Sequence, residues 1–406
     1  MEDEKMISDF QKILSTNVKG MKRSAIRELL KLTGDPEIIS FAGGLPSPDS
    51  FPIQQLKEIV NEVLDEDGAS ALQYGATEGD TRLRELLVEN YRASGFDITI
   101  DNLMITTASQ QGLDLLTKVF VNRGDKIIVG LPSYLGGLSA FNSYGADPVG
   151  VKFDDKGMRA DLLEAALEEM KQKGEKPKFI YVIPDFQNPA GITMPESRRK
   201  EIIALARKYD VIIVEDSPYK ELRFEGEDQK SLYALDNTGH VITLGTFSKI
   251  FVPGFRIGWV IAHPEILDKF IVAKQATDLC TSPFVQKISA KYLEKGYYAE
   301  NLVKTIAMYK EKKEVMMKAF DDFMPEGVTW TRPEGGLFLF LTLPEHMDSE
   351  ELFMEALKEK VAFVIGHVFH CDGSGKNTMR INFSYATKDQ IVEGVKRLAT
   401  AIKKTM

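Results

Sequence analysis

Several features that mark other protein classes are scarce or missing in this 406-residue chain. Only two cysteines occur, Cys280 and Cys371, which excludes a disulfide framework and favours a reducing compartment. Basic residues do not predominate: the formal net charge is -9, which argues against a general polyanion binder such as a nucleic-acid-binding protein. A small local pocket for one phosphate is still compatible with this charge.

Long apolar runs are also missing. No stretch approaches the roughly 18–20 apolar residues that a membrane-spanning helix needs. The first ten residues, MEDEKMISDF, lack the basic and apolar parts of a signal peptide. We therefore expect a cytoplasmic protein with no membrane or nucleic-acid partner. We also expect no metal centre, because the pair His367 and His370 has no further Cys or acidic ligands nearby.

The chain does contain a regular alternation of short apolar segments and amphipathic stretches. From about residue 102, segments such as KIIVG, FIYVIP, VIIVED and HVITLG alternate with helical patterns such as 161–173 and 196–209. Strands that are apolar throughout are expected where helices cover both faces of a sheet. This pattern predicts an α/β fold with a sheet between two helical layers.

The pattern changes after about residue 277. A long charged helix over 299–323 precedes GGLFLFLTLP, a helix over 349–360 and TMRINFSYA, which predicts a smaller α+β domain. We expect a large domain over residues 51–295 and a small domain over 296–406. Residues 1–50 are too few to form a domain, so we expect them to pack on the small domain or on a partner chain.

The strongest chemical signal is TFSKIFVPGFRIGW, residues 246–259, which follows an apolar strand. Lys249 would lie at the end of that strand, where α/β sheets bind ligands. Ser248 and Arg256 supply a hydroxyl and a permanently charged guanidinium, a pair that suits a phosphate. On its own, such a lysine is more often a surface residue, so the prediction depends on the other segments.

Two further strand ends carry polar side chains. Asp216 ends the strand VIIVED, and Tyr219 follows it by three residues. A strand-end Asp is often a cap or turn residue, but it could also keep a pyridine nitrogen protonated. Asn188, in the turn QNPAG after another strand, could donate a hydrogen bond to a phenolate oxygen.

Two more segments suggest anion binding. In TTASQQG, Ser109 and Gln110 lie where a strand leads into a helix, so backbone N–H groups there could face an anion. The same segment could be a simple helix cap. Arg380 lies in the otherwise apolar strand TMRINFSYA, where it could be an edge charge or could bind an α-carboxylate through two hydrogen bonds.

In this order, the segments resemble the fold-type I pyridoxal 5'-phosphate-dependent aminotransferases over nearly the whole chain. The motifs SFAGGLPSPDSFP, LQYGATEGDTRLRELL and GTFSKIFVPGFRIGW are the most specific. They resemble the branch that contains α-aminoadipate, kynurenine and multi-substrate aromatic or branched-chain aminotransferases. The resemblance implies a mainly parallel seven-stranded sheet, pyridoxal 5'-phosphate as cofactor, and a homodimer with shared active sites.

The resemblance also implies a role for each matching residue. Lys249 would hold the cofactor covalently and then move protons, Asp216 would pair with the pyridine nitrogen, and Asn188 and Tyr219 would hold the phenolic oxygen. The phosphate and ring contacts would come from Ser109, Gln110, Tyr134, Ser248, Arg256 and, from the partner subunit, Tyr74. Gly44 and Arg380 would meet the substrate carboxylate, and Asn188 would line the same end.

The expected reaction moves an amino group from an α-amino acid to a 2-oxo acid, with 2-oxoglutarate favoured, in a ping-pong mechanism. Arg27 is aligned with an arginine that binds a distal carboxylate in this branch, but it could equally be a solvated helix residue. Tyr74, Tyr134 and Phe383 could instead line an apolar pocket. The amino donor could be aminoadipate, an aromatic or an aliphatic amino acid.

Two alternatives remain at the level of sequence. A β-lyase or decarboxylase of the same fold would share Lys249 and Asp216. A transcription regulator with an aminotransferase-like domain would carry an additional basic winged-helix domain at its N-terminus. In this acidic chain the resemblance begins within the first 20 residues, which disfavours the regulator.

Overall fold

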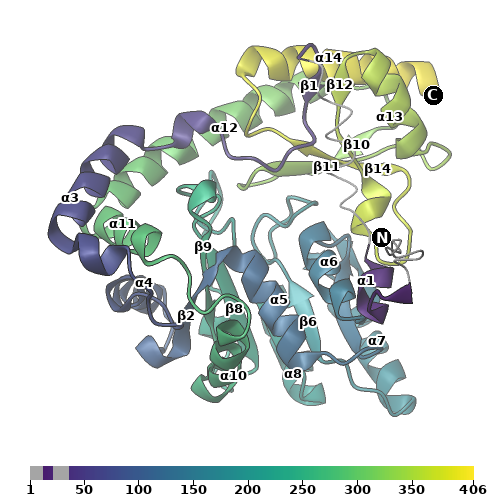
Figure 1. Cartoon of the computed structure of the whole chain (residues 1–406). Helices are drawn as coiled ribbons and strands as arrows, with labels where there is room; N and C mark the ends of the chain where they lie inside the picture. The colour runs from purple at the N-terminus through teal and green to yellow at the C-terminus, as the bar shows by residue number, and fades with distance from the viewer. Residues whose placement is uncertain (1–11, 22–35) are drawn as a thin grey trace, which may run out of the picture.

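A computed structural model describes residues 12–21 and 36–406. Its main feature is a large twisted sheet in the strand order β2-β9-β8-β7-β6-β3-β4-β5, seen in the lower half of Figure 1. The strands are β2 (Leu103–Thr107), β3 (Lys126–Leu131), β4 (Asp147–Asp154), β5 (Gly157–Met158), β6 (Phe179–Val182), β7 (Ile212–Asp216), β8 (Val241–Thr246) and β9 (Ile257–Ile261).

The sheet is mainly parallel, as predicted. Strand β9 runs antiparallel to both of its neighbours, β2 and β8, whereas β8, β7, β6, β3 and β4 run parallel to one another. The prediction of seven strands matches the longer ones. An eighth strand, β5, has two residues and pairs antiparallel with the edge strand β4, because the chain turns back at residues 155–156.

Helices cover both faces of this sheet because successive strand residues point to opposite sides. In β6 and β7, Phe179, Tyr181 and Val214 pack in the core beneath α5 (Ala108–Phe120) and α6 (Leu135–Ser143). Their neighbours Ile180 and Ile213 pack in a second core beneath α7 (Ala160–Gln172) and α8 (Glu196–Tyr209). The predicted three-layer α/β arrangement is therefore confirmed.

This layering also fixes where the functional side chains meet. The carboxyl ends of the parallel strands β6, β7 and β8 lie at one edge of the sheet. The loops that leave these three strands carry Asn188, Ser217 and Lys249. Residues that are far apart in the sequence are thereby brought to one site, as is general for open α/β sheets.

The remaining helices connect the sheet to a smaller second part. They are α1 (Thr16–Gly20), α3 (Ile53–Ala71), α4 (Thr81–Ala93), α9 (Leu232–Leu235), α10 (Pro264–Gln275), α11 (Pro283–Glu294), α12 (Tyr297–Phe323), α13 (Ser349–Lys358) and α14 (Lys388–Thr405). Short 3-10 turns are η2 (Pro48–Ser50), η3 (Ile100–Asn102), η4 (Pro253–Phe255) and η5 (Gly366–Phe369). Helix α12 contacts both α11 and α14, so it runs from the large part to the small one (Figure 1).

The small part is an antiparallel sheet in the order β10-β11-β14-β13, covered by α13, α14 and the end of α12. Its strands are β10 (Thr329–Trp330), β11 (Phe338–Thr342), β13 (Val364–Ile365) and β14 (Thr378–Asn382). A separate pair joins β1 (Ile39–Ser40) to β12 (Val361–Ala362) in parallel. The N-terminal chain around residue 40 thus lies against the C-terminal part, while domain boundaries near residues 50 and 295 remain a prediction.

No helix within residues 12–21 and 36–406 is both long and apolar enough to cross a membrane.

Candidate active site

Lys249 lies in the turn that follows the fully buried strand β8. Its Nζ donates a hydrogen bond of 2.8 Å to the carbonyl oxygen of Gly44, which comes from the N-terminal segment. Burial lowers the pKa of Lys249 to about 8, and the nearby positive charges of Arg380 and Arg256 act in the same direction. A substantial fraction of this amine is therefore neutral near pH 8, as a nucleophile or a general base requires.

Asp216 ends strand β7 and is buried beside Tyr181, whose hydroxyl donates to its Oδ2 over 2.7 Å. The second carboxylate oxygen, Oδ1, is buried and has no hydrogen-bond partner among the described residues. Burial raises the pKa of Asp216 to about 7, while the hydrogen bond from Tyr181 opposes the rise. A buried carboxylate oxygen without a donor is costly, so this side chain is suited to a charged N–H partner.

Arg380 is almost completely buried on β14 and lies over the rings of Phe338 and Phe369, at 4.3 and 5.2 Å from their centroids. It donates from Nη2 to the carbonyl of Ala42 at 2.8 Å and from Nη1 to Oδ1 of Asn188 at 3.0 Å. Its Nε is unpaired, and within residues 12–21 and 36–406 it forms no ion pair with a carboxylate.

Burial lowers the pKa of Arg380 to about 10. A buried guanidinium with no counter-ion is unfavourable unless an anion joins it. A carboxylate is the anion that the planar fork of an arginine binds best.

Asn188 contacts both the guanidinium of Arg380 and the hydroxyl of Tyr219. Its Nδ2 lies 3.4 Å from the hydroxyl of Tyr219, and both side chains are buried. Burial raises the pKa of Tyr219 above its usual value, so the phenol stays protonated. The Tyr219 ring meets Phe338 edge to face, with centroids 5.9 Å apart. The amide N–H of Asn188 thus donates to the hydroxyl of Tyr219, so the two donors lie side by side, where a ligand oxygen could accept from both.

The predicted phosphate residues lie around the start of helix α5. Ser109 and Gln110 are in its first turn, where backbone N–H groups have no partner within the helix. The carbonyl of Arg256 accepts a hydrogen bond from the N–H of Ala108 at 2.9 Å, and Arg256 Nη1 lies 3.5 Å from Ser248 Oγ. Helix N–H groups, a hydroxyl and an exposed guanidinium together suit a phosphate.

One glycine makes that arrangement possible. A Cβ on Gly258 of strand β9 would lie 2.5 Å from the backbone nitrogen of Ser109 and 2.6 Å from the carbonyl carbon of Ala108. Strand β9 can therefore approach the start of α5 only without a side chain at this position.

Tyr134 precedes helix α6 and is half-buried. Its hydroxyl lies 3.4 Å from Oε1 of Gln110, whose Nε2 donates to the carbonyl of Gly136 at 3.0 Å. Burial raises the pKa of Tyr134, and the negative charge of Asp216 adds to the effect. The contact with Gln110 thus holds the phenol beside the start of α5, where the predicted phosphate residues lie.

Two predicted residues are not brought into this cluster. Tyr74 is 79% exposed, and its backbone N–H donates to its neighbour Gln73. It has no contact with the Lys249 site within its own chain. Arg27 lies outside the described residues, so its predicted role in substrate choice stays a prediction.

Two contributors were missed in the sequence. Tyr181, which donates to Asp216, lies in the segment FIYVIP, for which the sequence predicts a strand but no role in the site. Its register opposite Val214, two residues before Asp216, places both side chains on one sheet face, so period-two counting could have found it. Phe338, which contacts both Arg380 and Tyr219, gave no distinct signal within GGLFLFLTLP.

The prominent cavity near this edge of the sheet is a different space. It measures about 280 Å³ and is lined mainly by residues 87–96 of α4 and the loop after it, residues 217–221 after β7, and residues 243–250 of β8 and the turn after it, with Trp259 and Tyr298. It reaches Ser217 and Thr246, next to the site, but Lys249 does not line it. The site is therefore defined by the unpaired polar groups above and not by this cavity.

The sheet order, the antiparallel strand β9 between β2 and β8, and the small α+β part are those of the fold-type I pyridoxal-phosphate enzymes. The chain resembles the kynurenine aminotransferase of Pyrococcus horikoshii in complex with PMP, with a TM-score of 0.94 and 47% identity over 98% of each chain.

Sequence comparison narrows the class to one family. The family described as aminotransferase class I and II matches residues 36–398, and the chain belongs to it. Aromatic-amino-acid aminotransferase 1 of Thermococcus litoralis is 50% identical over 400 residues, 98% of this chain and 96% of that protein. The 2-aminoadipate transaminase of Thermus thermophilus is 40% identical over 386 residues, 94% of each.

The protein is therefore a pyridoxal 5'-phosphate-dependent aminotransferase, as the sequence predicted. These relatives, 40–50% identical, are aminotransferases, whereas matching transcription regulators are only 26–29% identical. The residues present fit the cofactor: Asp216 has a buried oxygen free for a ring N–H, and Lys249 is a lysine with a lowered pKa.

Proposed function

We propose that this aminotransferase transfers the amino group of an aromatic, aminoadipate-type or aliphatic α-amino acid to 2-oxoglutarate, with Arg380 binding the α-carboxylate common to these substrates. The observation that carries the proposal is the buried guanidinium of Arg380, which forms no ion pair with a carboxylate among the described residues. The names of the relatives from Thermococcus and Thermus support the aromatic and the aminoadipate-type donors.

We assign the other roles by position. Asp216 would pair with the ring nitrogen, Asn188 and Tyr219 would hold the phenolic oxygen, and Tyr134 would cover the ring. The phosphate would be bound by Ser109, Gln110, Ser248 and Arg256. When bound, the cofactor supplies an electron sink for the substrate's Cα.

Lys249 would carry the proton. Once released from the cofactor, its Nζ needs to be neutral to take a proton from Cα, and a pKa of about 8 favours the neutral amine in mildly alkaline solution. The carbonyl of Gly44, 2.8 Å from Nζ, can keep the amine oriented between proton uptake and proton release. Arg380 fixes the carboxylate end, so that the Cα–H bond can face Nζ.

The test replaces Arg380 with Met and compares two kinds of amino donor with 2-oxoglutarate. For α-amino acids, kcat/KM should fall about 100- to 1,000-fold, as expected when one partner of a buried charge pair is removed. For a primary amine of similar shape that lacks the carboxylate, kcat/KM should equal the wild-type value, because in a ping-pong mechanism this quantity reports only on the donor's half-reaction, which does not use Arg380. Steady-state kinetics on cofactor-saturated protein check both. Equal losses for both donors would show that Arg380 serves the fold and not the carboxylate.

We further propose a cytoplasmic homodimer in which Tyr74 completes the site of the partner subunit. The support is its 79% exposure and that of Leu72, at 72%, at the end of helix α3. Exposed apolar side chains that lie together, as these two do, are typical of surfaces that bind a partner. The two free cysteines are in keeping with a reducing compartment.

Mixing two inactive variants tests the shared site. Lys249→Ala and Tyr74→Ala each impair every site of their own dimers. In a mixed dimer, one site combines the intact Lys249 of one chain with the intact Tyr74 of the other. After co-refolding of equal amounts, activity should return to about one quarter of wild type, since half of the dimers are mixed and each has one complete site. No recovery in verified mixed dimers would contradict the proposal.

A further inference from the structure

The loop between β6 and α8 carries Asn188 and is buried over residues 183–191. Its two ends are joined by a hydrogen bond of 2.7 Å from the N–H of Met194 to the carbonyl of Pro184. Within the loop, the side chain of Gln187 accepts from the N–H of Ala190 at 2.7 Å and donates to the carbonyl of Pro132 at 3.0 Å. The position of Asn188 therefore depends on how the two ends of the loop, at Pro184 and Met194, are held.

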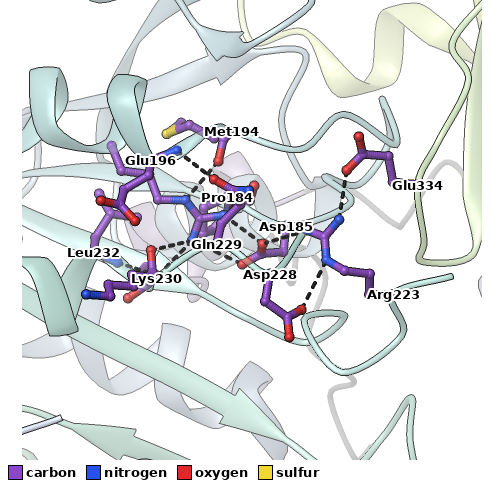
Figure 2. Close-up of polar contacts among 12 residues, drawn as sticks. Pro184, Asp185, Met194, Glu196, Arg223, Asp228, Gln229, Lys230, Leu232 and Glu334 are labelled. Atoms are coloured by element: carbon purple, nitrogen blue, oxygen red, sulfur yellow. Dashed lines mark hydrogen bonds and ion pairs between the residues drawn. The ribbon is translucent and has the colours of Figure 1, made fainter. Parts of the chain in front are cut away.

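Arg199 of helix α8 holds these two ends of the loop. It is completely buried, and each of its five N–H groups has an acceptor. Nε donates to the carbonyl of Met194 at 2.8 Å, and Nη1 and Nη2 reach the carbonyls of Lys230 and Pro184 at 3.1 and 3.3 Å. The two remaining N–H groups bind the carboxylate of Asp185 at 2.6 and 3.3 Å (Figure 2).

Asp185 has a second cation on its other side. Arg223 Nη2 lies 3.9 Å from Asp185 Oδ1, and its guanidinium lies over the ring of Phe186, 4.8 Å from the centroid. The same arginine binds Glu334 at 2.7 Å and Asp228 at 3.2 Å (Figure 2). Asp185 therefore lies where the loop, helix α8 and the segment before β11 meet.

The charge of Asp185 is needed because another acid competes for Arg199. Glu215, one residue before Asp216 on β7, is completely buried and has its Oε1 4.0 Å from Arg199 Nη1. Its carboxylate already accepts from the N–H groups of Leu232 and Tyr233 and from Thr243. If Asp185 lost its charge, Arg199 would be drawn towards Glu215 and away from the carbonyl of Pro184.

We propose that Asp185 is a positioning residue for substrate binding: paired with Arg199, it sets the place of Asn188 and, through it, the orientation of Arg380. Asn188 Oδ1 receives the hydrogen bond from Arg380 Nη1 at 3.0 Å, so a shift of the loop turns the guanidinium. The inference rests on the proposed role of Arg380 in binding the α-carboxylate. Neither Asp185 nor Arg199 needs to touch the substrate.

The test compares Asp185→Asn with a matched control, Asp154→Asn. Asp154 pairs with Arg198, the residue next to Arg199 on the same helix, at 3.0 Å, but it does not contact the Asn188 loop. Both substitutions remove one carboxylate charge from an arginine of α8. The readouts are cofactor content, melting temperature, KM and kcat for an α-amino acid, and the dissociation constant of 3-phenylpropanoate, an unreactive carboxylate, from cofactor absorbance.

For Asp185→Asn we expect KM and the dissociation constant of 3-phenylpropanoate to rise about tenfold, with less than a threefold change in kcat and full cofactor content. Asp154→Asn should match the wild type in all of these. Equal behaviour of the two variants would overturn the inference. Wild-type protein that binds no carboxylate and transaminates no α-amino acid would instead overturn the proposed function.

A second variant covers the case in which Asp185→Asn does not accumulate as folded protein. Asp185→Glu keeps the charge, so it should fold, but its extra methylene cannot fit between Asp185 and the fully buried Arg199 without moving the two apart, so it should still displace the loop. The same rise in KM is expected, and a wild-type KM in the folded variant would contradict the inference.

Discussion

Lysine and acidic side chains lie in two contrasting settings in this enzyme. At the active site, burial lowers the pKa of Lys249 and raises that of Asp216, and neither forms an ion pair with an opposite charge among the described residues. Between α3 and α11, Lys295 pairs with Glu58 at 2.9 Å and Glu62 at 2.6 Å. Hydrogen bonds between these partners raise the pKa of the lysine and lower that of both acids.

The two regions differ because of solvent and partners and not because of residue type. The surface charges satisfy one another and remain hydrated, so they have little capacity left for a ligand. The site charges are desolvated and leave specific atoms unpaired, namely Asp216 Oδ1 and Arg380 Nε. A buried polar atom without a partner is unfavourable until a ligand binds it. Groups with strongly perturbed pKa values therefore gather at functional sites.

The largest expected effect separates two lysines. Lys249→Ala should lower kcat by at least about 100- to 10,000-fold, the usual contribution of a positioned acid–base group, and should remove the visible absorbance of lysine-bound cofactor. Lys295→Ala, the matched surface control, should keep the wild-type kcat and the visible absorbance, because Lys295 forms ion pairs only with Glu58 and Glu62 among the described residues. Steady-state kinetics and absorbance spectra measure the two effects. Wild-type turnover in purified Lys249→Ala would remove the basis for the comparison.

Much of the site could be predicted from the sequence because its residues follow apolar strands. Lys249 and Asn188 each follow a buried strand and Asp216 ends one, and the parallel strands β6, β7 and β8 bring these ends together. The α/β layering was predictable for the same reason, since period-two and period-3.6 patterns depend only on nearby residues.

What the sequence did not reveal depends on long-range packing. The contact of Gly44 with Lys249 joins positions 205 residues apart, and no local pattern encodes it. The short strand β5 was missed because two residues carry no periodicity. In the sequence, Arg199 is one of several charged residues of a predicted amphipathic helix. In the structure it is completely buried against Asp185. Only the tertiary structure distinguishes it from its neighbour Arg198.

The smallest expected effect concerns pH and the cofactor-free protein. The pKa of Asp216 is raised in the folded chain, from 3.8 to about 7. An acid with a raised pKa keeps its proton in the folded state while the unfolded state loses it. Stability from this group is therefore full below about pH 4, declines as the pH rises, and levels off above about pH 7. The difference corresponds to at most about 4 kcal/mol.

Asp216→Asn removes this titration while keeping the size of the side chain and an acceptor for the hydroxyl of Tyr181. Melting temperatures of cofactor-free wild type and variant, measured from pH 4 to pH 8, should converge at the acidic end and diverge by several degrees at pH 8, with the variant more stable. Subtracting one curve from the other cancels other titrating groups such as His370. In the loaded enzyme, a cationic N–H partner favours the carboxylate, so the same comparison should then reverse in sign at neutral pH. Parallel curves in the cofactor-free proteins would show that Asp216 is already ionised and solvated there, like Glu62 on the surface.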